Sequence, residues 1–267
     1  MNKVLSRVQQ SRYERQLLLP QFGFDGQETL STSTALIVGL GGLGCAAAQY
    51  LAASGIGRLL LADFDNVELS NLQRQVLHGD ADLGKNKAES AAQALAAINP
   101  HVELVPMIER LEVEKIEAVN ASSGIAQFDI TQVDISKVDV VVDCSDNLAT
   151  RELLNEVCYQ NQTPLVSGAA IRMEGQVAVF PMTPGAPCYQ CLSRHFGEQE
   201  LSCVEAGVLA PLVGIIGSMQ ALETIKVLTG VGETLAGRLL LFDGAYGEWQ
   251  RFELPVWPDC PVCQNAS

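Results

Sequence analysis

The chain has 267 residues, of which 48% are hydrophobic, and a formal net charge of −14 at pH 7, and this size suits one large α/β domain or two small ones with a substantial core. The negative charge argues against non-specific binding to nucleic acid or anionic membranes, because both need positive charge on the protein to offset phosphates. No uninterrupted apolar run reaches ~18 residues and the chain starts in a polar segment, so we expect no membrane span, no signal peptide and a cytoplasmic location.

An apolar strand is predicted over residues 35–38, and it runs into a cluster of glycines and an alanine-rich helix. Gly39, Gly41 and Gly44 have the spacing of the dinucleotide-binding fingerprint, whose glycines permit a tight turn, close approach of a phosphate and close packing of helix on strand. With Gly42 they would present the N–H groups of a helix start to an anion. A purely structural turn is the alternative.

A second apolar strand is predicted over residues 58–62, and two carboxylates follow it. Asp63 lies about 20 residues beyond the last glycine, where a carboxylate that binds ribose hydroxyls is expected, and Asp65 follows closely. A strand before the glycines, a helix after them and an acid at this distance favour an adenosine nucleotide over a structural turn. The motif leaves open whether that nucleotide is a nicotinamide cofactor or ATP.

The segment after the second strand carries amides and two cations that bear on this choice. It contains Ser70, Asn71, Gln73 and Arg74 within SNLQRQ, and Lys87 behind a short loop. A triphosphate carries more negative charge than the pyrophosphate of a redox cofactor, and Arg as a planar fork and Lys as a point charge suit that charge. Positions on a solvated face are the alternative for both cations.

The next stretch predicts ordinary structural elements. A helix is expected from residue 90 that ends before Pro100, and a strand over residues 101–106. His78 and His101 are interpreted as residues of the fold without a chemical role. Residues 112–137 are expected to form a surface segment without a functional site.

Residues 138–142 have the composition of a parallel strand buried on both faces. Such a strand delivers the residues behind it to the carboxyl end of the sheet, where ligands of open α/β folds bind. Asp146 is there a candidate ligand for Mg²⁺ beside a triphosphate, and Asn147 is a candidate contact to the nucleotide. The alternative for Asp146 is a capping role at the helix that starts near Leu148.

The second half of the chain predicts antiparallel structure. A strand over residues 163–167 leads into a hairpin that ends at residue 180, and a helix over residues 210–229 is followed by paired strands over residues 238–242 and 248–254. We therefore expect an α/β fold in which a Rossmann-like nucleotide-binding sheet continues from a parallel half into an antiparallel half. No linker or change of composition marks a second domain.

Four of the eight cysteines stand in two C-x-x-C pairs, Cys188 with Cys191 and Cys260 with Cys263. Two such pairs beside Pro and Gly turns can hold one tetrahedral Zn²⁺ through four thiolates. A closed shell of four thiolates leaves no position for water or substrate, so this site is expected to be structural and to clamp the end of the chain to its middle. Unmetallated thiols are the alternative.

Taken together, these motifs resemble the MoeB/ThiF family of enzymes that adenylate ubiquitin-like sulfur carriers. The likeness runs from Arg12 to Cys263 and rests on RYERQLLLPQFGFDGQE, GLGGLG, DFD, SNLQRQ with the lysine after it, DCSDN, SGAAIRMEGQ, CYQCLSR, CVEAGVLAPLVGIIGS and the two C-x-x-C pairs. It implies one adenylating domain over residues 1–267, with an N-terminal arm and ATP-binding half over residues 1–160 and a carrier-binding half with the zinc clamp over residues 161–267.

The resemblance implies ATP-dependent adenylation of the C-terminal glycine carboxylate of the carrier, with release of pyrophosphate. By this likeness Asp63 binds the ribose, Arg74 and Lys87 join the glycine turn in binding the phosphates, and Asp146 holds Mg²⁺. Enzymes of this family are homodimers in which an arginine at the position of Arg15, in the predicted helical N-terminal arm, reaches the partner's ATP.

Two points stay open within this resemblance. Most motifs look like the members that serve the small subunit of molybdopterin synthase (MoaD type) in molybdenum cofactor biosynthesis, but LFDG followed by Trp249, Gln250 and Arg251 looks like the branch that serves the thiamine-pathway carrier (ThiS type). Cys203 matches a loop cysteine that in relatives attacks an activated carrier or forms a persulfide, so it is either an auxiliary thiol or a half-buried loop residue. A NAD-dependent oxidoreductase and a non-catalytic carrier-binding scaffold are remoter alternatives.

Overall fold

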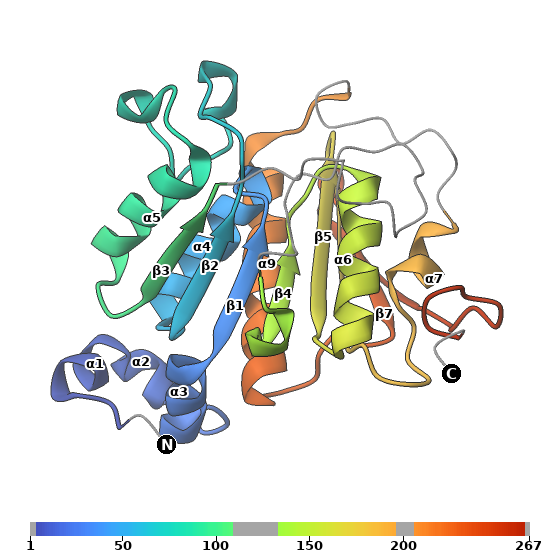
Figure 1. Ribbon diagram of the computed structural model, residues 1–267, viewed down its shortest axis with the longest axis horizontal. Coiled ribbons are helices and arrows are strands. Elements are labelled where there is room, and N and C mark those ends of the chain that lie inside the picture. Colours follow the sequence, from blue (N-terminus) through green and yellow to red (C-terminus); the bar gives the residue numbers. More distant parts are fainter. Residues whose placement is uncertain (1–3, 109–132, 196–205, 265–267) are drawn as a thin grey trace.

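An eight-stranded sheet forms the middle of the molecule, with helices on both of its faces (Figure 1). The computed structural model describes residues 4–108, 133–195 and 206–264. The strands are β1 (Thr34–Val38), β2 (Arg58–Ala62), β3 (Glu103–Met107), β4 (Val140–Asp143), β5 (Leu165–Ile171), β6 (Glu174–Phe180), β7 (Arg238–Asp243) and β8 (Glu248–Glu253). The α-helices described are α1 (Arg7–Arg12), α2 (Glu14–Leu17), α3 (Gly23–Thr32), α4 (Gly42–Ser54), α5 (Lys87–Ile98), α6 (Leu148–Asn161), α7 (Tyr189–Ser193) and α9 (Ala210–Thr229).

Parallel strands form one half of the sheet and antiparallel strands the other, which confirms the predicted fold class. The strand order is β3-β2-β1-β4-β5-β6-β7-β8, with parallel pairs up to β5 and antiparallel pairs beyond it. Apolar side chains buried on both faces explain the parallel half, in which Ile37 of β1 lies beside Leu61 of β2 and Val142 of β4. The edge strand β8 is exposed along its whole length.

The order of the strands reverses between β1 and β4. The chain builds β1, β2 and β3 outward to one side, and then crosses to the other side of β1 to build β4 and β5. The helices that follow these two strands, α4 and α6, lie on opposite faces of the sheet (Figure 1). Such a reversal opens a crevice at the carboxyl ends of the two strands, where ligands of open α/β sheets bind.

Two hydrophobic clusters, one on each face of the sheet, hold the layers together. Successive residues of a strand point to opposite faces, so Leu36 and Val38 enter one cluster while Ala35 and Ile37 enter the other. The first cluster includes residues of α6 and α7, and the second includes residues of α4, α5 and α9. Burial of this apolar surface is the main favourable contribution to folding.

The helix α9 crosses one face of the sheet and packs against α4 (Figure 1). Gly217 permits this contact, because a Cβ there would lie 2.3 Å from the Leu43 carbonyl oxygen and 2.9 Å from the Ala46 methyl group. Among the described residues α9 is the helix long and apolar enough to cross a membrane, but 44% of its apolar window is buried inside the fold. Its position therefore fits a core helix.

The predicted elements are present, with some ends shifted. The helix expected from residue 90 begins at Lys87, because the Asn86 side chain caps it by accepting from N–H groups of the first turn. β5 extends to a turn at Arg172 and Met173, whereas the sequence predicted a shorter strand. Most of residues 112–137 lie outside the described residues.

Candidate active site

A cavity of about 790 Å³ opens at the carboxyl ends of the strands, at the point where the strand order reverses. Its volume suits a small-molecule ligand such as a nucleotide. The predicted site residues that line it are Gly39, Gly41, Gly42, Asp63, Asp65, Asn71, Arg74, Lys87 and Asp146. The predicted site residues that are not among the lining are Arg15, Gly44, Ser70, Gln73 and Asn147.

The turn between β1 and α4 requires glycine at two positions. Gly39 has φ +89°, in the left-handed region, and a Cβ on it would lie 2.8 Å from the Cys144 carbonyl oxygen. A Cβ on Gly44 would lie 1.9 Å from the Gly39 carbonyl oxygen, so the helix and the turn pack directly on each other. Gly41 is the N-cap of α4 and lines the cavity. The N-terminus of α4 is therefore placed to bind an anion.

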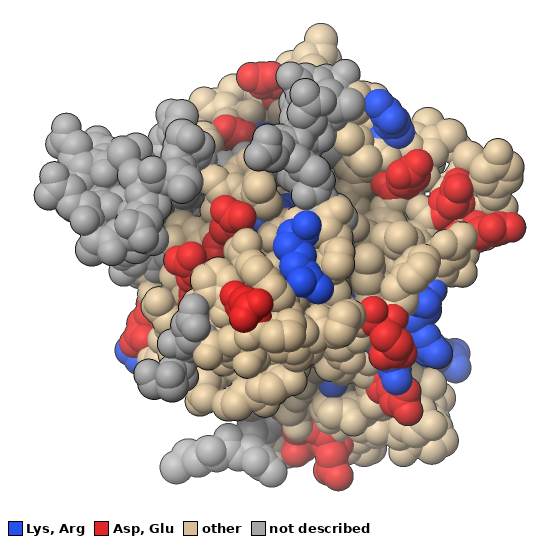
Figure 2. Space-filling model, turned by 90° about the vertical axis from the view of Figure 1, so that its right-hand side faces the viewer, with Lys and Arg blue, Asp and Glu red and all other residues tan. Residues whose placement is uncertain are grey.

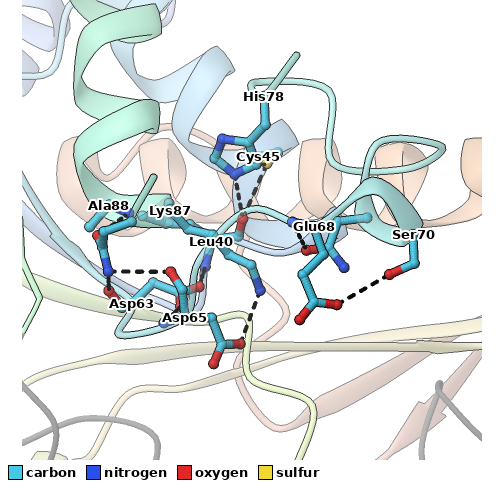
Figure 3. A network of polar contacts seen from close by, with 11 residues as sticks. Leu40, Cys45, Asp63, Asp65, Glu68, Ser70, His78, Lys87 and Ala88 are labelled. Carbon is cyan, nitrogen blue, oxygen red and sulfur yellow. Dashed lines mark hydrogen bonds and ion pairs between the residues drawn. The ribbon is translucent and has the colours of Figure 1, made fainter. Parts of the chain in front are cut away.

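Asp63 is buried at the end of β2 and is held by two backbone N–H groups (Figure 3). The N–H of Leu40, in the glycine turn, donates to Oδ2 at 2.7 Å, and the N–H of Asp65 donates to Oδ1 at 2.9 Å. Burial raises the pKa of Asp63, while the Lys87 charge and the two N–H donors act in the opposite direction. The carboxylate is thus fixed at the cavity wall, as a group that binds ribose hydroxyls must be.

Lys87 is a buried cation and not a surface residue. Its Nζ lies 3.0 Å from Asp65 Oδ2, and its side chain is only 9% exposed (Figure 3). Asn86 ties this start of α5 to the end of β2, because its Nδ2 donates to the carbonyl oxygens of Asp63 and Asp65 at 3.0 and 3.2 Å. The alternative of a solvated position is therefore wrong for Lys87.

Arg74 reaches the cavity from the turn that follows a short 3₁₀ helix after β2. Its Nη1 donates to the Ser70 carbonyl oxygen at 3.1 Å, which sets the direction of the side chain. The Ser70 hydroxyl donates to Glu68 Oε2 at 3.4 Å (Figure 3), and Gln73 is exposed. Glu68 and Gln75 line the cavity although the sequence did not predict them, and Gln75 belongs to the same SNLQRQ motif.

The segment after β4 brings a carboxylate to the cavity. Asp146 is exposed on the cavity wall, whereas Asn147 is the N-cap of α6 and accepts from the Thr150 N–H at 2.9 Å. The residue that caps α6 is therefore Asn147 and not Asp146. Contact of Asn147 with a nucleotide stays a prediction. Asp143, buried beneath, accepts from the Ser145 hydroxyl at 2.6 Å and fixes the start of the segment.

One wall of the cavity comes from the antiparallel half and from segments next to it, and it was not predicted. Its members are Ala169, Ala170, Ile171, Arg172, Glu174, Gly175, Gln176, His195, Val208 and Leu241. Arg172 has φ 54°, and its backbone is held by the Gly207 carbonyl oxygen at 2.7 Å and the Leu209 N–H at 3.0 Å. Much of this wall belongs to the SGAAIRMEGQ motif, but strand pairing and such long-range bonds bring its residues to the cavity, so the motif alone did not mark them as site residues.

The N-terminal arm places Arg15 away from this cavity. Arg15 is exposed on α2, and Figure 1 shows α2 at the opposite end of the sheet from the start of α4. It does not line the cavity of its own chain. Cys203 lies outside the described residues, so its role stays a prediction.

The four cysteines predicted to hold zinc form one buried cluster. Their Sγ atoms all lie within 4.8 Å of one another, with 3.6 Å between Cys188 and Cys260 and 3.6 Å between Cys191 and Cys263. Zn–S bonds of about 2.3 Å in a tetrahedron place sulfurs about 3.8 Å apart, so the cluster fits Zn²⁺. The Asn155 amide donates to Cys188 Sγ at 3.6 Å, which supports a thiolate there.

A nucleotide-sized cavity at the reversal of a Rossmann-like sheet, with cations beside a glycine turn, defines a nucleotide-binding α/β protein. Residues 13–262 match the model of the ThiF family, and the chain belongs to that family. It is 51% identical over 259 residues to the molybdopterin-synthase adenylyltransferase of Escherichia coli (strain K12), which covers 97% of this chain and 98% of the relative. The protein of the same name from Haemophilus influenzae is 51% identical over 252 residues, 94% of this chain and 98% of the relative.

More distant similarities agree with this assignment. The adenylyltransferase and sulfurtransferase of Drosophila yakuba is 47% identical over 256 residues, and the match covers 95% of this chain but 53% of the relative. The crystal structure of PaaA has a TM-score of 0.76 at 25% identity, covering 95% of this chain and 76% of that one. E. coli MccB with ATP has a TM-score of 0.77 at 23% identity, covering 94% and 74%, and shares the fold. The resemblance to the MoeB/ThiF family is confirmed.

Replacing Cys263 by Ala tests whether the cysteine cluster holds zinc. Because the closed shell loses one of four thiolates, we expect zinc content to fall from one ion per chain to below about 0.2 and thermal stability to fall with it. Cys158→Ala is the matched control, since it removes a buried thiol of α6 outside the cluster. Elemental analysis of both purified variants is the measurement, and full zinc content in Cys263→Ala would contradict the assignment.

Proposed function

We propose that this protein adenylates the C-terminal glycine carboxylate of a small ubiquitin-like sulfur carrier, with ATP as the donor and pyrophosphate as a product. The carrier is of the MoaD type, the small subunit of molybdopterin synthase, in molybdenum cofactor biosynthesis. The observation that carries this proposal is 51% identity, over nearly the full length, to relatives named molybdopterin-synthase adenylyltransferase. The ThiS-type carrier is the second candidate, favoured by the LFDG sequence and Trp249 of the β7–β8 hairpin.

The cavity supports this reaction through its charges. Asp63 binds the ribose hydroxyls, while the glycine turn, Arg74 and Lys87 bind the phosphates. Lys87 is buried, so solvent screens its charge little, while the ion pair with Asp65 fixes its position and offsets part of that charge. The carrier carboxylate attacks the α-phosphorus, the bond from that phosphorus to the bridging oxygen breaks, and pyrophosphate leaves. Alignment and stabilisation of charge are the contribution of the protein.

Asp146 is the residue that would hold Mg²⁺. Its carboxylate is exposed on the cavity wall beside the glycine turn, and carboxylate oxygens next to substrate phosphates are the protein ligands that Mg²⁺ prefers. When bound, Mg²⁺ supplies neutralisation of charge on the leaving pyrophosphate. A cytoplasmic location, where Mg-ATP is available, belongs to the same proposal.

The antiparallel half supports the proposed contact with the carrier. The cavity wall at β5 carries the small residues Ala169 and Ala170, which leave room for an extended glycine-containing C-terminus. Beyond it, Trp249 and Phe252 of β8 are 42% and 47% exposed. Exposed aromatic side chains on an edge strand suit contact with a folded partner.

We further propose a homodimer in which Arg15 of one protomer contacts the ATP of the other. Arg15 is exposed on α2, at the opposite end of the sheet from the start of α4, so a second protomer offers the route to a nucleotide (Figure 1). Two-fold symmetry would give both sites the same additional guanidinium. Arg15 would then add positive charge to a site in a chain whose formal net charge is −14.

Replacing Arg74 by Ala should remove most pyrophosphate formation while the protein stays folded. Loss of one preorganised charge contact to the transferring group costs on the order of 10²-fold in turnover. Lys85→Ala is the control, because Lys85 is a nearby cation that pairs with Asp82 and does not line the cavity. Pyrophosphate release from Mg-ATP and carrier is measured for both variants, with circular dichroism as a check of folding. Undiminished turnover would remove Arg74 from the site.

Mixing two inactive variants tests the position of Arg15. Arg15→Ala and Arg74→Ala homodimers should each be nearly inactive, but a mixed dimer has one site with both arginines intact if Arg15 acts across the interface. Random exchange of subunits should therefore restore about a quarter of the wild-type rate. Native mass spectrometry verifies the exchange. Exchange without any recovery of activity would show that Arg15 does not act on the partner's site.

A further inference from the structure

Leu40, in the middle of the glycine turn, is held by buried side chains on both sides (Figure 3). Its N–H donates to Asp63 Oδ2 at 2.7 Å. Its carbonyl oxygen lies 3.2 Å from His78 Nε2 and 3.3 Å from Cys45 Sγ. His78 is buried and is not among the residues that line the cavity. The histidine therefore contacts the turn from the side of the protein interior.

The geometry of the peptide bond gives this contact a consequence for the ligand. The Leu40 carbonyl and the Gly41 N–H belong to one planar trans peptide unit, so they point in opposite directions. Holding the carbonyl toward His78 therefore turns the Gly41 N–H away from the interior, and Gly41 lines the cavity. Glycine on both sides of Leu40 leaves the backbone free to rotate unless a side chain fixes this peptide.

The hydrogen bonds define which nitrogen of His78 carries the proton. A carbonyl oxygen can only accept, so Nε2 is the donor to Leu40, and Nδ1 at 2.9 Å from Ser90 Oγ accepts from the hydroxyl. Burial and the Lys87 charge lower the pKa of His78, while the Leu40 contact and Asp82 oppose them, which favours this neutral form. Burial raises the pKa of the Cys45 thiol to about 12, so it remains a second donor to the same carbonyl.

We infer that His78 is a positioning residue of the nucleotide site, which aims the Gly41 N–H at a phosphate group of the nucleotide by holding the Leu40 carbonyl. Ser90 orients the imidazole from α5, the helix that also carries Lys87. The His78 ring thus contacts both the glycine turn, at the Leu40 carbonyl, and α5, the helix that carries Lys87. The interpretation of His78 as a residue of the fold without a chemical role is the alternative that the test must exclude, and the inference rests on ATP being the ligand, as proposed above.

The test separates the phosphate part of the ligand from the nucleoside part. His78→Leu removes the donor, so the Leu40–Gly41 peptide can rotate and the Gly41 N–H is no longer held toward the phosphate. We expect the affinity for ATP to fall about tenfold, equivalent to 1.4 kcal/mol. The affinity for adenosine, whose ribose would bind Asp63, should change less than about twofold. His78→Gln, whose Nε2 can donate to the same carbonyl, should recover most of the ATP affinity. Ligand-observed NMR without carrier measures both ligands.

The outcomes discriminate between positioning and mere stability. Equal losses for ATP and adenosine, or His78→Gln as weak as His78→Leu, would show a general structural role and overturn the inference. Ser90→Ala keeps the ring and removes its orienting hydroxyl, so a selective loss of ATP affinity of about threefold supports the inference even if His78→Leu does not fold. A wild-type chain that binds no ATP would overturn the proposed function itself, whereas wild-type binding with unaffected variants overturns the role of His78 alone.

Discussion

The site depends on how closely the chain passes itself at the glycine turn. A Cβ on Gly44 has no space beside the Gly39 carbonyl, and a Cβ on Gly39 has none beside the backbone that follows β4. This contact brings the start of α4 and the segment after β4 to one edge of the sheet. The remaining groups are held near that edge. Asp63 is held by its hydrogen bond from the Leu40 N–H, and Lys87 by its ion pair with Asp65, which follows β2.

Paired charges give an acidic protein a site suited to an anion. The chain as a whole carries −14, a field that opposes the approach of ATP. Lys87 opposes this field locally because it is buried, where its charge is weakly screened, although Asp65 offsets part of that charge as well as part of its desolvation. Figure 2 shows acidic and basic side chains interspersed on the side of the molecule that it presents, so no extended basic surface is seen there. Because the net charge is −14, binding of a nucleotide depends on the cavity and not on a general attractive field of the protein.

Features of the site carried by one stretch of sequence were predictable, as was the change from a parallel to an antiparallel half of the sheet, whereas the cavity wall that strand pairing assembles was not. The glycines and the four cysteines carry local signals, because a tight turn and a metal shell each demand particular residue types at fixed spacing. The bounds of α9 were predicted from its apolar pattern, which ends at Gly230 in the left-handed conformation. Arg172 and Gln176 reach the cavity through the register of β5 and β6, which the sequence does not specify locally. A single histidine such as His78 belongs to no sequence motif, because its partner Leu40 lies 38 residues away and only the fold brings the two together.

Adenylation of a carrier by this protein is most directly measured as a change in the mass of the carrier. The purified protein would be incubated with Mg-ATP and, separately, with a MoaD-type and a ThiS-type carrier, while pyrophosphate is quantified. We expect the MoaD-type carrier to gain the mass of one AMP at its C-terminal glycine, with one pyrophosphate released for each adenylate formed. Neither carrier gaining that mass, with the protein folded and its zinc content complete, would contradict the account.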